Sequence, residues 1–69
     1  RKLLAPVIWR GLVVVGDSDG WLHVFSPRDG APRGRKRAAG APLMSVVVDA
    51  PQLLTLSVEG RLAAWDLKP

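Results

Sequence analysis

Two aspartates and the only histidine of the chain lie together in the stretch Gly16–His23, GDSDGWLH. Carboxylates two residues apart and followed by glycine resemble part of a calcium loop, because Ca²⁺ takes oxygen ligands at alternate positions. A complete loop would also need an oxygen ligand two residues before Asp17 and a glutamate at its twelfth position. Val15 and Ser26 stand at these places. The sequence therefore favours a hairpin turn, with glycine at positive φ, over a metal site.

His23 lies between Leu22 and Val24 in an apolar stretch. A nucleophilic triad would need a serine and an acid oriented around it, and the chain has no nucleophile-elbow sequence. Paired acids for glycoside hydrolysis are equally unsupported. With no cysteine and one histidine, a disulfide and a Cys/His zinc site are excluded. The sequence predicts a packed or hydrogen-bonded structural histidine, no cofactor, and a chain that is not an enzyme.

Aromatic residues mark the ends of several apolar segments. Trp21, Phe25 and Trp65 are expected to pack in the core or between sheets rather than stack on a ligand. Trp9, beside Arg10-Gly11, is a candidate for an exposed position at a rim. Since the function of repeat scaffolds usually resides in loops, the turns around residues 18–20, 27–30 and 49–52 are candidate contact regions. The candidate partner-facing residues are Trp9, Asp17, Asp19 and Asp29.

The net charge is +4, and five of the ten basic residues lie within ten positions. These five residues are Arg28, Arg33, Arg35, Lys36 and Arg37. The cluster could bind nucleic acid. No aromatic residue is interleaved with Arg33–Arg37, however, so base stacking is unsupported. We favour an outermost strand that is charged so that it does not pair with other chains.

Short β-branched and apolar runs alternate with turn residues along the chain. Leu12–Val15, Trp21–Phe25, Val46–Val48 and Leu62–Leu67 are predicted strands, because no segment keeps a helical period. Glycine-containing turns separate them. The fold class predicted is all-β.

The chain also repeats with a shift of 40 residues. Gly20 falls on Gly60, Leu22 on Leu62, and Phe25 on Trp65. The second copy has Ser57 in place of Asp17. A repeat of this length with three or four strands is typical of a β-propeller blade of four antiparallel strands. Residues 1–40 are therefore predicted to form one blade, and residues 41–69 a second blade without its last strand.

A chain of 69 residues can bury only a thin core. It begins at Arg1 without methionine, and we expect it to be part of a longer protein. Two blades cannot close a ring, and they leave apolar faces uncovered. The isolated chain is therefore predicted to self-associate.

Over nearly its whole length the sequence resembles the C-terminal end of the BamB family of outer-membrane protein assembly factors. The resemblance is carried by Pro6-Val7-Ile8, by the run from Val14 through His23, by Asp29-Gly30, and by the second copy down to Trp65. It implies the last two blades of an eight-bladed propeller with pyrroloquinoline-quinone-type repeats. The basic run from Arg33 to Arg37 departs from the family pattern.

The family consists of scaffold lipoproteins on the periplasmic face of the bacterial outer membrane that bind the barrel subunit BamA. The resemblance implies the same non-catalytic role here, with other barrel-assembly subunits as further partners and no nucleic acid. The family's lipid-anchored cysteine is absent from this sequence. Two alternatives stay open: a fragment of a quinoprotein dehydrogenase propeller, and a basic nucleic-acid-binding module.

Overall fold

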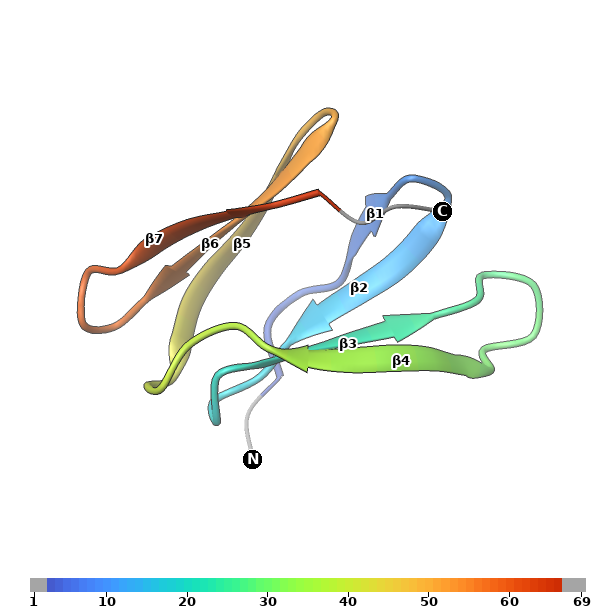
Figure 1. Ribbon diagram of the computed structural model, residues 1–69. Helices are drawn as coiled ribbons and strands as arrows, with labels where there is room; N and C mark the ends of the chain where they lie inside the picture. The colour runs from blue at the N-terminus through green and yellow to red at the C-terminus, as the bar shows by residue number, and fades with distance from the viewer. Residues whose placement is uncertain (1–2, 67–69) are drawn as a thin grey trace.

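The computed structural model describes residues 3–66. These residues form seven strands, shown in Figure 1. The strands are β1 (Val7–Trp9), β2 (Leu12–Gly16), β3 (Trp21–Phe25), β4 (Pro32–Arg37), β5 (Leu43–Asp49), β6 (Gln52–Ser57) and β7 (Leu62–Trp65). The predicted strand from Leu62 to Leu67 is β7 as far as Trp65, and Leu67 lies outside the described residues. Between residues 3 and 66 there is no helix that could cross a membrane.

The strands form two antiparallel sheets in which neighbours along the chain are neighbours in space. Sheet 1 has the order β1-β2-β3-β4, and sheet 2 has the order β5-β6-β7. This arrangement confirms the all-β prediction and is consistent with part of a propeller. The tight β1–β2 turn has Arg10 and Gly11 at φ 54° and 76°. Positive φ at both central residues is the geometry that suits the twist of a two-residue hairpin.

The repeat seen in the sequence is present in the strand pairing. Three cross-strand residue pairs of sheet 1 have counterparts in sheet 2 whose residue numbers are higher by 40. The matched pairs are Val7–Val14 with Val47–Leu54, Val13–Phe25 with Leu53–Trp65, and Val15–His23 with Thr55–Ala63. Because a slip of one residue would turn every side chain to the other face, the two sheets present equivalent positions on equivalent faces.

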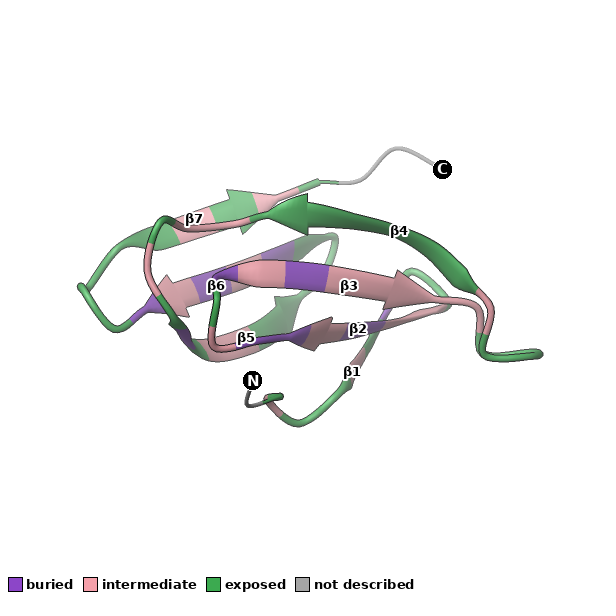
Figure 2. Ribbon diagram, turned by 90° about the horizontal axis from the view of Figure 1, so that it is seen from below, coloured by how far each residue is buried: buried purple, intermediate pink, exposed green. Residues whose placement is uncertain are grey.

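One core lies between the two sheets. Its buried members are Trp9, Val14, Leu22, Leu43 and Leu53. β5 contacts both β1 and β2, and Figure 2 shows the buried segments on the inner strands, whereas β4 is exposed along its whole length. The placement of the basic run on an exposed outer strand of sheet 1 is confirmed, because β4 pairs only with β3 among residues 3–66.

Trp9 was predicted to be a candidate for an exposed rim position, and this prediction is wrong. The side chain is only 2% exposed. Its Nε1 donates a hydrogen bond of 3.0 Å to the carbonyl oxygen of Pro51, in the β5–β6 turn. Burying a large indole yields much apolar contact, and its N–H needs a partner once it leaves water. Trp9 therefore holds the two sheets together instead of facing a partner.

Candidate functional site

Asp17 organises the β2–β3 turn from a buried position. Its Oδ1 accepts hydrogen bonds from the backbone N–H groups of Asp19 at 2.8 Å and Trp21 at 3.0 Å. Its Oδ2 lies 2.6 Å from Nε2 of His23. The side chain is 0% exposed. The prediction that Asp17 could face a partner is therefore wrong, because its oxygens are directed into its own turn.

The hydrogen bonds also determine the charge state of Asp17. Burial opposes ionisation and would raise the pKa, but the bonds from His23, Trp21 and Asp19 outweigh it. Together they lower the pKa of Asp17 from 3.8 to about 2. The carboxylate is thus ionised at neutral pH, and the prediction of a hydrogen-bonded structural histidine at position 23 is confirmed.

The other two predicted contact residues lie apart from each other. Asp19 is exposed in the β2–β3 turn, and Asp29 is exposed in the β3–β4 loop, at the other end of β3. The Oδ1 of Asp29 accepts a hydrogen bond of 3.0 Å from the N–H of Ala31. In the part of the chain that the structure describes, no group of three or more His, Cys, Asp or Glu side chains could hold a metal ion. The aspartates therefore act within separate turns.

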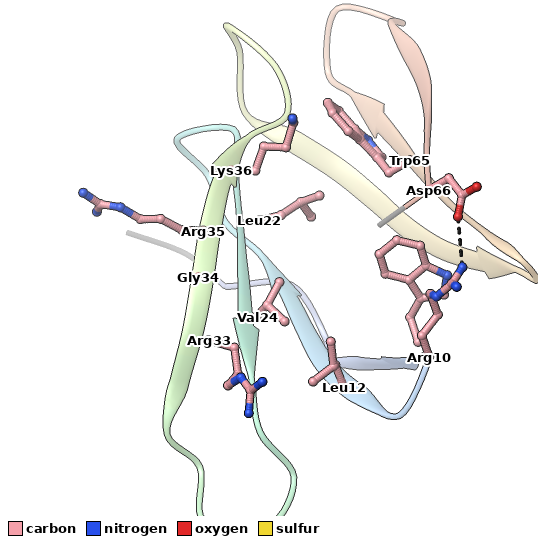
Figure 3. A pocket seen from close by; sticks show the side chains of 11 residues that line it. Arg10, Leu12, Leu22, Val24, Arg33, Gly34, Arg35, Lys36, Trp65 and Asp66 are labelled. Atoms are coloured by element: carbon pink, nitrogen blue, oxygen red, sulfur yellow. Dashed lines mark hydrogen bonds and ion pairs between the residues drawn. The ribbon is translucent and has the colours of Figure 1, made fainter. Parts of the chain in front are cut away.

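A groove of about 700 Å³ lies between the two sheets, where β3 and β4 face β7. Its apolar wall comes from both sheets, and Figure 3 shows these side chains converging. The apolar lining residues are Trp9, Leu12, Leu22, Val24 and Trp65. Sequence analysis missed this groove, because its lining residues are far apart in the chain and meet only when the sheets pack.

Basic side chains form one rim of the groove. The register between β3 and β4 shifts between Val24 and Phe25, so that Arg33 is an extra residue in β4. A bulge of this kind changes the direction in which a side chain points. Figure 3 shows Arg33 and Lys36 extending on the groove side of β4, while Arg35 points away. The bulge therefore gives the groove a second cation.

The far rim of the groove is formed by residues at the end of β7. Nζ of Lys36 lies 5.2 Å from the ring centroid of Trp65, and the Nε1 of Trp65 donates a hydrogen bond of 2.9 Å to Oγ1 of Thr55. Arg10 and Asp66 form an ion pair of 2.9 Å across one end. Since this pair is exposed, it contributes little to stability. It does neutralise Asp66, the acid that lines the groove.

The opposite face of β4 carries a different arrangement. The guanidinium carbons of Arg35 and Arg37 lie 5.0 Å and 5.4 Å from the ring centroid of Trp21. The Nε of Arg37 also donates a hydrogen bond of 2.8 Å to the carbonyl oxygen of Ala39. The basic run is thus divided by the pleat and the bulge, with Arg35 and Arg37 on Trp21 and with Arg33 and Lys36 at the groove.

Known proteins with similar sequences share one name. No protein-family model matches the chain. The outer membrane protein assembly factor BamB of Alkalilimnicola ehrlichii is 39% identical over 67 residues, which are 96% of this chain and 18% of that protein. The BamB proteins of Moranella endobia and Legionella pneumophila are 31% and 34% identical, over 93% and 90% of this chain and 16% of each relative.

The chain therefore spans less than a fifth of the length of these curated relatives. The three matches nevertheless cover nine-tenths of the chain or more. Similarity at this level in three different bacteria agrees with the resemblance noted in the sequence. The chain is a BamB-like sequence that corresponds to part of these longer proteins.

Proposed function

We propose that the chain is part of a non-catalytic scaffold that assists the assembly of outer-membrane proteins. The observation that carries this proposal is the similarity to BamB along both sheets. We further propose that BamA is its partner and that it works on the periplasmic face of the outer membrane. In this view residues 1–40 and 41–69 belong to the last two blades of an eight-bladed propeller.

The geometry of the polar residues supports a binding role over catalysis. Asp17 and His23 are the pair best suited to proton transfer, and their hydrogen bond holds the β2–β3 turn. The groove between the sheets instead offers apolar surface with a few charged groups at its rim. Such surfaces are typical of binding sites.

The test is a direct binding measurement with the purified periplasmic region of BamA from the same bacterium. We expect the folded chain to bind it, and Lys36→Ala, at the exposed groove rim, to weaken the complex. Arg61→Ala, in the exposed β6–β7 turn and outside the groove, is the matched control and should leave the affinity unchanged. No binding by a chain that retains its β-sheet circular dichroism would contradict BamA as the partner.

The same preparation separates the two alternative functions. A quinoprotein dehydrogenase fragment would bind pyrroloquinoline quinone, which can be followed by its absorbance. A nucleic-acid-binding module would bind DNA with a steep salt dependence that Arg35→Ala with Lys36→Ala removes. We expect neither kind of binding. For nucleic acid the reason is that Arg35 and Arg37, two of the five clustered cations, lie on the ring of Trp21.

We also propose that the isolated chain associates head to tail. Val13, Val15 and Phe25 lie on the face of sheet 1 that sheet 2 does not cover. Their counterparts in the repeat, Leu53, Thr55 and Trp65, are the residues with which sheet 2 packs toward sheet 1. The exposed residues Val47 and Leu62 correspond in the same way to Val7 and Leu22 of the core cluster. The uncovered face of sheet 1 in one copy can therefore pack against the exposed face of sheet 2 in the next copy.

Light scattering on a sizing column measures this association. A discrete tetramer would indicate a closed ring of blades, as heterologous contacts allow when the rotation closes. Polydisperse species would indicate open stacking. A stable monomer would contradict the proposal.

A further inference from the structure

β4 differs from the other strands in its exposure and in its charge. Of the seven strands in residues 3–66, it is the only one whose residues are all exposed. Four of its six residues are the cations Arg33, Arg35, Lys36 and Arg37. No acidic residue lies between Asp29 and Asp49 in the sequence. A strand that only has to avoid pairing with other chains can carry charge of either sign, so the uniform positive charge needs a further reason.

The place of β4 at the outside of the fold does not depend on where the chain ends. Sheet 1 has four strands, and the chain both enters and leaves β4 within the described residues. Sheet 2 packs on sheet 1 through contacts of β5 with β1 and β2. A preceding repeat that packed in the same way would contact sheet 1 at β1, the counterpart of β5. Such packing leaves β4 outermost, and Figure 2 shows β4 exposed along its whole length.

Three of the four cations lie on tryptophan rings, which hold their long side chains against the sheets. Arg35 and Arg37 lie on Trp21, and Lys36 lies over Trp65. A guanidinium that stacks through its planar face keeps the N–H groups in its plane for an acceptor. None of the four cations takes part in the two ion pairs formed among residues 3–66. Within the described residues, the positive charge of β4 is therefore held in place and is not neutralised by a carboxylate.

The spacing of these cations suits a surface that carries many phosphate groups. Arg33 and Arg37 are about 14 Å apart along the strand, since each residue advances the chain by about 3.4 Å. Guanidinium and ammonium groups bind phosphate through charge-assisted hydrogen bonds. A cluster of Lys and Arg residues is typical of segments that contact anionic lipid headgroups. Single-stranded nucleic acid also needs open aromatic faces for stacking, and the ring of Trp21 already carries two arginines.

We propose that β4 is a contact surface for an anionic lipid bilayer, with its four cations on the phosphate groups of the lipid heads. Each Lys or Arg near such a surface contributes about fivefold to the affinity, so that the four together give a weak and reversible contact. The inference rests on the proposed role at the outer membrane only in taking a bilayer as the anionic surface. It requires no partner protein.

The experiment measures flotation of the full 69-residue chain with lipid vesicles, which separates bound chain from any aggregate. One set of vesicles is made of phosphatidylcholine alone, and the other also contains phosphatidylglycerol. We expect binding to the anionic vesicles that falls as salt is added, because salt screens exposed charges. Binding to the neutral vesicles should be weaker by about tenfold or more.

Paired variants locate the contact on β4. Arg33→Gln with Arg35→Gln removes one cation from each side of the strand and should weaken binding to the anionic vesicles by about 25-fold. Arg33→Lys with Arg35→Lys keeps both charges and should bind as the unaltered chain does. Arg61→Gln, in the exposed β6–β7 turn, is the control for net charge and should change binding by less than about twofold. The comparison of the two kinds of vesicle on the unaltered chain does not depend on any variant folding.

Several results would overturn the proposal. A folded chain that binds both kinds of vesicle equally, or neither kind, would exclude a contact with anionic lipid. A loss of about fivefold in Arg61→Gln would show that net charge, and not β4, governs binding. Equal losses in the glutamine pair and the lysine pair would exclude charge as the cause.

A comparison with duplex DNA distinguishes the two kinds of phosphate surface. Tighter binding to DNA than to anionic vesicles at the same phosphate concentration would assign β4 to nucleic acid instead. The vesicles contain no protein, so this result and the result with BamA can each stand when the other fails.

Discussion

The turn at residues 17–21 of sheet 1 and the turn at residues 57–61 of sheet 2 share their backbone hydrogen bonds but differ in their side chains. In both turns the first residue donates its N–H to the carbonyl of the fifth and accepts from the N–H of the fourth. Asp17 Oδ1 and Ser57 Oγ each accept from the third and fifth residues. A serine hydroxyl can therefore replace an aspartate in shaping the backbone.

The second carboxylate oxygen makes the difference. Oδ2 of Asp17 reaches His23, whereas Ser57 has a single side-chain oxygen and Ala63 stands at the place of His23. The connection between the sheets also packs over the first turn, where the N–H groups of Ala38 and Ala39 donate to the carbonyl of Gly20. Both repeats therefore keep the same backbone turn, while the side chains of each turn differ with the residues that pack against it.

The largest expected difference concerns the two turn glycines. A β-carbon on Gly20 would lie 2.3 Å from the carbonyl oxygen of Ala39, whereas one on Gly60 would meet nothing within 4 Å. Both have positive φ, at 89° and 84°. We expect Gly20→Val to abolish folding, because small domains have only a few kcal/mol of stability. Gly60→Val should damage folding less: we expect the free energy of unfolding to fall by about 1–2 kcal/mol, which is the cost of valine at positive φ alone.

Urea unfolding followed by circular dichroism measures both glycine variants. Gly11→Ala, at an open position of positive φ in the β1–β2 turn, is the control for conformational strain alone. Equal losses at Gly20 and Gly60 would refute the distinction between the covered and the open turn.

The next largest effect concerns the side-chain oxygens of Asp17 and Ser57, which accept the backbone hydrogen bonds in the two turns. Asp17→Ala removes a buried acceptor from two backbone N–H groups and leaves His23 without this partner, and we expect a loss of about 3 kcal/mol. Ser57→Ala removes the same backbone bonds alone and should cost about 1–2 kcal/mol. The free energy of unfolding of each variant gives the comparison.

A double variant isolates the histidine. Asp17→Ser with His23→Ala copies the polar pattern of sheet 2 into sheet 1, and we expect it to be more stable than Asp17→Ala. If it is no better than Asp17→Ala, the two turns are not interchangeable at these positions.

Acid should weaken the first turn more than the second. The folded-state pKa of Asp17 is lowered to about 2 from 3.8. Its contribution to stability is therefore complete above the unfolded value and is lost as the pH falls from about 4 toward 2. Urea midpoints between pH 5 and pH 2 measure this loss, and Asp17→Asn should flatten it. An unchanged slope in Asp17→Asn would show that other carboxylates cause the loss.

The smallest effect concerns the cations on the tryptophans. Two guanidinium groups stack on Trp21 in sheet 1, and one ammonium lies over Trp65 in sheet 2. We expect Arg35→Gln to cost about 0.5 kcal/mol, because exposed cation–π contacts are weak. Arg28→Gln is the control at an exposed site, and the two unfolding curves should differ only slightly. A loss well above 1 kcal/mol would assign Arg35 a larger structural role.

The sequence by itself determined the strands, the turns and the repeat. β-branched runs and glycine turns are local signals. The shift of 40 residues appears again in the strand register, because equivalent positions in the two repeats must point to the same face of their sheet. The glycines at positions 20 and 60 have the predicted positive φ for the same local reason.

Only the tertiary structure decided which polar and aromatic groups are free to meet a partner. Trp9 and Asp17 looked accessible in turn sequences, yet packing of the second sheet covers Trp9, and the turn's own N–H groups draw Asp17 inward. The bulge that places Arg33 on the groove side of β4 likewise leaves no mark in the sequence. The burial of Trp9 depends on contacts with the second sheet, which is far away in the chain. The direction of the Asp17 side chain depends on the folded turn and not on residue types alone.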